Sequence, residues 1–160
     1  MIRAVLHIEA SREHVFATLT DYPRYKEWFP GCEHSTIISR TGGSVDAEFI
    51  INRMKRVKVW IRFEAQPTRA LSFRMISGRD LKSYSGSYRL MDSPDGKGTI
   101  VIAEMRIEVA VMVPSFVVDH VAKKSIDDTG NSLRRYLKRV LSNPQTPPQR
   151  HNGYGDSFSL

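Results

Sequence analysis

Cysteine and long hydrophobic runs are almost missing from this sequence of 160 residues. Cys32 is its single cysteine, which excludes an intramolecular disulfide and a zinc site built on cysteines. No stretch approaches the roughly 20 apolar residues that a membrane-spanning helix needs. The first ten residues alternate between apolar and polar and carry Arg3 and Glu9, so we expect no signal peptide. These absences predict a protein of the reducing cytoplasm.

Catalytic and metal-binding motifs are missing as well. The sequence has no Gly-x-Ser-x-Gly elbow, phosphate-binding loop, His-Glu-x-x-His or Cys-x-x-Cys. Its five histidines are scattered, and none has metal-ligand spacing to another. Asp119 and His120 are neighbours and would point about 100° apart on a helix, which argues against an acid–base pair. We therefore predict no metal site and assign no catalytic residue.

The residues that are present suit one globular domain. Hydrophobic residues make up 41% of the chain and charged residues 26%. Period-two alternation predicts a strand over 2–9, and Ser11 is the expected N-cap of a short helix over 12–20, followed by a second short helix over 23–29. Six further strands, separated by Gly, Pro, Asp and Ser turns, are predicted over 33–41, 44–53, 55–65, 69–77, 80–92 and 97–109.

A long helix is expected to close the domain. Pro114 suits its first position, and the helix runs to about Leu141. We assign 1–142 to one domain and 143–160 to a Pro/Gly-rich tail. Short connections between strands imply an antiparallel meander with one apolar face, which only the last helix is large enough to cover. The sequence thus predicts an α+β fold in which a curved sheet of about seven strands wraps one C-terminal helix.

The apolar stripe of that helix thins out in its middle. Bulky residues stand at both ends, and between them come Ala122, Ser125, Thr129 and Gly130. A gap in side-chain volume opposite a concave sheet predicts an internal cavity. The alternative is that small residues let helix and sheet approach closely.

Aromatic residues are expected to line such a cavity. Tyr84 and Tyr88 stand out, because a buried phenol needs a hydrogen-bond partner from the protein or from a ligand. Trp28 and Phe29 are expected to cap one mouth or, alternatively, to pack the short helices down. The expected lining set is Trp28, Phe29, Phe49, Val59, Ile61, Phe73, Tyr84, Tyr88, Met105, Ile107, Val117, Val121 and Ser125.

A basic stripe follows the central strands. The chain has 24 Lys and Arg against 17 Asp and Glu, for a net charge of +7. Trp60 lies within the stripe and shares a strand face with three of its cations. The stripe has three interpretations: a solvated outer face, an RNA or ribosome contact, or peripheral binding to an anionic membrane surface. Its cations are Arg53, Lys55, Arg56, Lys58 and Arg62.

Three segments carry a resemblance to a known family. The stretch from Asp21 to Cys32, DYPRYKEWFPGC, resembles the Asp-x-x-x-Tyr-x-x-Phe-x-Pro-x-Cys stretch of START-like (SRPBCC) proteins in the polyketide cyclase and coenzyme-Q-binding group. Residues 81–90 are similar to that group's Leu-x-Gly-x-Trp-x-Phe strand, with Tyr88 where Trp is usual. Residues 97–109 and the following VPSF at 113–116 resemble its last strand and helix start.

The resemblance covers about residues 2–141. It implies a helix-grip fold with an apolar tunnel between sheet and terminal helix. Members of the group bind polyprenyl quinones or other lipids, cyclise polyketides, or associate with ribosomes as toxins. The favoured function is therefore binding or transport of a hydrophobic small molecule (quinone, isoprenoid or other lipid), with no other cofactor. A polyketide-type cyclase or dehydratase and a ribosome- or RNA-associated module are the alternatives.

Overall fold

A computed structural model describes residues 1–53, 55–110 and 112–142 of the chain. The tail assigned to 143–160 lies outside the described residues. The elements follow the predicted order: β1 (Ile2–Ile8), α1 (Arg12–Leu19), the 3₁₀ turn η1 (Tyr22–Arg24), α2 (Tyr25–Trp28), β2 (Cys32–Thr41), β3 (Ser44–Asn52), β4 (Arg56–Gln66), β5 (Ala70–Gly78), β6 (Leu81–Asp92), β7 (Thr99–Val109) and α3 (Ser115–Ser142).

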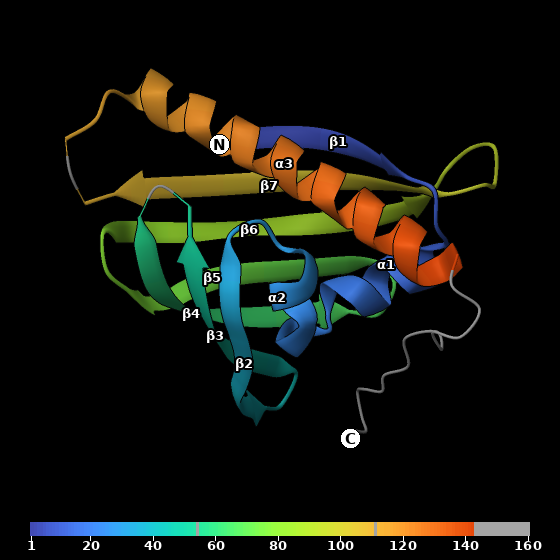
Figure 1. Cartoon of the computed structure of the whole chain (residues 1–160), viewed down its shortest axis with the longest axis horizontal. Helices are drawn as coiled ribbons and strands as arrows, with labels where there is room; N and C mark the ends of the chain where they lie inside the picture. Colours follow the sequence, from blue (N-terminus) through green and yellow to red (C-terminus); the bar gives the residue numbers. More distant parts are fainter. Residues whose placement is uncertain (54, 111, 143–160) are drawn as a thin grey trace.

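One antiparallel sheet of seven strands forms the body of the domain. Its strand order is β1-β7-β6-β5-β4-β3-β2, a meander from β2 to β7 with β1 added beside β7. Helix α3 crosses one side of this sheet diagonally, from beyond the end of β7 to α1 (Figure 1). The predicted α+β helix-grip fold is confirmed.

Local sequence explains the elements that hold this arrangement. The Ser11 hydroxyl accepts a hydrogen bond from the His14 amide at 3.1 Å and caps α1, as predicted. Along β4, Val59, Ile61 and Phe63 alternate inward while Trp60 faces out, so one face of the strand is buried.

Helix α3 lies close to the sheet at Gly130. A Cβ atom on Gly130 would lie 2.8 Å from Cδ2 of Leu6 on β1, so a larger residue would force Leu6 to move. Ala122 packs with Ile126 against β1 and β7. The close-approach interpretation of the small residues is therefore correct at these positions.

Candidate functional site

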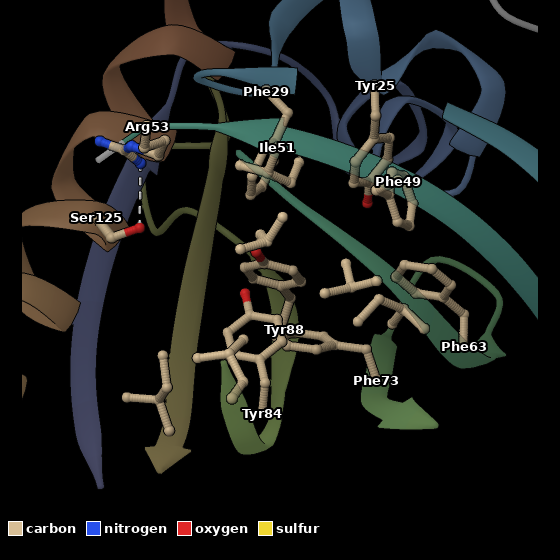
Figure 2. A pocket seen from close by; sticks show the side chains of 15 residues that line it. Tyr25, Phe29, Phe49, Ile51, Arg53, Phe63, Phe73, Tyr84, Tyr88 and Ser125 are labelled. Carbon is tan, nitrogen blue, oxygen red and sulfur yellow. Dashed lines mark hydrogen bonds between the residues drawn. The ribbon is translucent and has the colours of Figure 1, made fainter. Parts of the chain in front are cut away.

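A cavity of about 170 Å³ lies between the inner face of the sheet, α2, the end of β3 and α3 (Figure 2). Most of its wall is apolar, and its polar groups come from three tyrosines, one serine and one arginine. The lining residues are Tyr25, Phe29, Phe49, Ile51, Arg53, Val57, Val59, Ile61, Phe63, Phe73, Leu81, Tyr84, Tyr88, Ile107 and Ser125.

The aromatic part of the wall is continuous. The Phe73 ring lies 5.3 Å from the Tyr84 ring and 5.6 Å from the Tyr88 ring, measured between centroids. Gly86 faces Phe73 across the β5–β6 pair, and a Cβ there would come within 2.7 Å of Cζ of Phe73. The absence of a side chain at Gly86 lets the Phe73 ring lie between the two tyrosines.

The hydroxyls of Tyr84 and Tyr88 have no hydrogen-bond partner among the described residues. Both side chains point into the cavity from β6, and the accessible part of each faces it (Figure 2). Burial raises the pKa of Tyr84 to about 12 and that of Tyr88 further, so both phenols are protonated at neutral pH. Tyr25 differs, because its hydroxyl donates to the Leu19 carbonyl at 2.6 Å. The cavity thus offers two free hydroxyl groups to a ligand.

Arg53 marks the rim of the cavity, because it lines the cavity and still exposes 32% of its side chain. Its Nη1 donates to Oγ of Ser125 at 3.2 Å, and its Nη2 pairs with Oδ2 of Asp128 at 2.8 Å (Figure 2). The Cγ of Arg53 also packs on Gly31, where a Cβ would come within 2.7 Å of it. One side chain therefore connects the loop after α2, the end of β3 and α3.

The structure brings together nine of the residues expected from sequence to line the cavity. These are Phe29, Phe49, Val59, Ile61, Phe73, Tyr84, Tyr88, Ile107 and Ser125.

Four expected residues lie elsewhere. Trp28 is buried in the main core, and its carbonyl accepts from the Ser132 hydroxyl, so it packs α2 down instead of capping a mouth. Met105 belongs to a second core cluster under α3. Val117 and Val121 are exposed and lie outside the cavity lining, on the turns of α3 that precede Ser125.

Sequence reasoning missed six lining residues. Strand parity would have predicted two of them. Ile51 lies on the same face of β3 as Phe49, and Arg53, just past the end of β3, continues that alternation. Arg53 was instead placed in the basic stripe with the outward cations of β4. The other missed residues are Tyr25, Val57, Phe63 and Leu81.

Each cation of the basic stripe is paired with a carboxylate. Arg62 donates two hydrogen bonds to Asp46, with an Nε–Oδ1 distance of 2.8 Å, and these hydrogen bonds lower the pKa of Asp46. The Trp60 indole donates to Glu48 at 2.8 Å. The remaining pairs are Arg53–Asp128, Lys55–Asp80, Arg56–Glu33 and Lys58–Glu48. This pairing favours the solvated-face interpretation over a phosphate-binding surface.

Metal-ligand clusters and membrane-spanning helices are absent from the part of the chain that the structure describes. There, no group of three or more His, Cys, Asp or Glu side chains is placed to hold a metal ion. None of the helices in those residues is long and apolar enough to cross a membrane.

Several solved structures share this architecture. A START superfamily protein from Mycobacterium smegmatis superposes with a TM-score of 0.80 at 14% identity, covering 87% of this chain and 97% of the other. The Zhui aromatase/cyclase from Streptomyces sp. R1128 gives 0.75 at 14% identity, covering 88% and 94%. A STAR-related lipid transfer protein from Xanthomonas axonopodis gives 0.66 at 18% identity, covering 85% and 84%. At these identities the likeness shows the fold.

The sequence itself carries the family assignment. No curated protein matches it significantly. Residues 8–134, most of the described domain, match the family described as polyketide cyclase / dehydrase and lipid transport. The chain therefore belongs to the polyketide cyclase/dehydrase and lipid transport family.

Proposed function

We propose that the protein is a carrier that binds a quinone, isoprenoid or other lipid bearing a hydrogen-bond acceptor in this cavity. The observation that carries the proposal is the pair of hydroxyls of Tyr84 and Tyr88, which have no partner among the described residues and face a mostly apolar cavity. Both tyrosines are half-buried, and their hydroxyls have no partner among the described residues, so a ligand that supplies carbonyl oxygens gains affinity there. Each such hydrogen bond contributes about 0.5–1.5 kcal/mol.

The size of the cavity limits which part of a ligand it holds. At about 170 Å³ it is close to the roughly 150 Å³ of an apolar cavity that binds benzene. It therefore suits a head group of one or two rings, such as that of a quinone. A longer isoprenoid tail would leave past the rim at Arg53 and Ser125, where the wall meets solvent.

A cyclase or dehydratase is the second candidate, favoured by the likeness to the Zhui aromatase/cyclase. Such chemistry needs a group that removes protons, usually histidine or a carboxylate. The lining contains neither, and the raised pKa of Tyr84 and Tyr88 keeps both as hydrogen-bond donors. These groups polarise a carbonyl without supplying a base, so we favour the carrier.

Native mass spectrometry and solvent extraction of the purified protein test the proposal by identifying what copurifies. Binding of a short-chain quinone is then titrated by fluorescence. Ser125→Leu fills the cavity and should abolish binding, whereas Arg135→Leu places the same side chain on an exposed position of α3 and should not. Absence of any copurifying apolar molecule together with equal titrations for both variants would reject the carrier. Turnover of a polyketide-like substrate would favour the cyclase.

A further inference from the structure

Exposed apolar side chains gather at the start of helix α3 and in the residues just before it. We call this cluster the α3 apolar end: Met112, Val113, Phe116, Val117 and Val121. Met112 is fully exposed, and Phe116 exposes 73% of its surface. Single exposed apolar residues are ordinary, but five within ten residues of sequence form the kind of patch that marks an interaction site.

The α3 apolar end adjoins the rim of the cavity. Val121 lies one helical turn before Ser125, which lines the cavity and accepts from Arg53. Figure 1 shows the first turns of α3 at the same end of the molecule as the β3–β4 and β5–β6 connections. A ligand that leaves past Arg53 therefore emerges beside exposed apolar side chains.

Cations border this end. Arg79 and Lys82 flank the β5–β6 turn, which is tied to the end of β7 because the Ala110 amide donates to the Asp80 carbonyl at 3.2 Å. Lys123 lies on α3 itself. None of these three cations has an ion-pair partner among the described residues, whereas Asp80 is neutralised by Lys55.

The acids of this end are fewer than its unpaired cations. Asp119 lies on α3, and Glu108 on β7 accepts from the Ser83 hydroxyl at 3.0 Å. With a net charge of +7 for the whole chain, the balance favours an anionic partner. A second copy docked face to face would bring the same cations against each other, which disfavours a symmetric dimer through this face.

We propose that the α3 apolar end docks the protein on an anionic lipid bilayer by inserting Phe116 and its neighbours into the interface. Apolar side chains enter the boundary between head groups and acyl chains, and the bordering cations attract the acidic lipids. Docking in this way holds the cavity rim at the bilayer surface. Passage of a ligand between cavity and bilayer is a consequence that rests on the proposed function, whereas docking itself does not.

Flotation with vesicles tests the docking. Vesicles of equal parts phosphatidylcholine and phosphatidylglycerol should bind the wild type, and Phe116→Ser should weaken binding by about tenfold or more, since a buried phenylalanine is lost. Met91→Ser is the matched control, because Met91 exposes 44% of its surface on the outer face of β6. Equal binding by Phe116→Ser and the wild type, or no binding by the wild type, would overturn the proposal. Normal quinone titrations in Phe116→Ser would keep this outcome separate from a failure of the carrier function.

Tryptophan quenching by brominated lipid identifies the surface that contacts the bilayer. Phe116→Trp should gain a quenched emission over the wild type, whose Trp60 lies in the ion-paired basic stripe and should stay unquenched. Quenching of Trp60 would instead place the stripe on the membrane and refute docking through α3. Light scattering measures the oligomeric state and so tests whether a second copy of the chain occupies this face instead. A wild-type dimer that dissociates in Phe116→Ser would contradict the proposal.

Discussion

Replacing Tyr88 by phenylalanine should stabilise the folded protein while lowering its affinity for the ligand. The change keeps the ring, which packs 5.6 Å from Phe73, and removes only the hydroxyl. Since no described residue pairs with that hydroxyl, the variant breaks no hydrogen bond within the described domain. Changes from buried tyrosine to phenylalanine usually lower the free energy of unfolding. A rise in that free energy would therefore indicate that the Tyr88 hydroxyl serves ligand binding and not the stability of the fold.

The magnitude follows from the cost of an unpaired polar group. Leaving a buried donor unsatisfied costs about 1–3 kcal/mol, and access to the cavity reduces that cost for Tyr88. We expect the free energy of unfolding of the ligand-free protein to rise by up to about 1 kcal/mol, which raises Tm by about 2–4 °C in a chain of this size. The affinity for a quinone should fall about three- to tenfold, the loss of one hydrogen bond.

Tyr25→Phe is the matched control on the same cavity wall. It removes a hydroxyl that donates to the Leu19 carbonyl at 2.6 Å and leaves that buried acceptor unpaired. We expect it to lower the free energy of unfolding by about 1–2 kcal/mol. Urea titrations of both variants, with and without quinone, give the comparison. A Tyr88→Phe variant destabilised as much as Tyr25→Phe would refute the reasoning, because its hydroxyl would then be paired inside the folded protein.

Three further predictions concern the wall, the rim and alkaline pH. Gly86→Ala should lower the free energy of unfolding by about 2 kcal/mol or more in urea, because its Cβ meets the backbone of β7, whereas Gly43→Ala, in open space, should leave it unchanged. Arg53→Gln should speed quinone release several-fold in stopped-flow measurements with little change in stability, since exposed ion pairs contribute little; unchanged release would contradict its role at the rim. Between pH 10 and about 12 the free energy of unfolding should fall as pH rises, because folded Tyr84 and Tyr88 retain protons that unfolded tyrosines release; their double phenylalanine variant should show a flatter slope.

Strand parity made much of the cavity wall predictable. A strand alternates its side chains strictly, so the alternation along each strand places Phe49 of β3 and Val59 and Ile61 of β4 on the inner face. The same alternation predicts that Ile51 and Arg53 also face inward, but the charge of Arg53 favours an assignment to the outer face. Its true partner, Asp128, lies 75 residues away on α3, and no periodicity within a strand encodes such a contact.

Cross-strand partners explain why the basic stripe was overestimated. On β4 itself no acid interrupts the cations, but the β3–β4 register places Asp46 opposite Arg62 and Glu48 opposite Trp60. The acids that neutralise Lys58 and Arg62 therefore come from the neighbouring strand β3, and those that pair with the other three cations come from elements further away in the sequence. Register depends on the turn that joins the strands, which the sequence alone did not fix here.

The small residues in the middle of α3 have two different physical roles, although they form one continuous pattern in the sequence. At Gly130 the helix touches Leu6, so removal of a side chain brings helix and sheet together. One turn and more toward the N-terminus, Ser125 faces empty volume, and Val121 and Val117 are already exposed. The same stripe therefore packs on β1 at Gly130 and borders the cavity at Ser125. At Ser125 the helix is also tied to the cavity rim, because its hydroxyl accepts a hydrogen bond from Arg53.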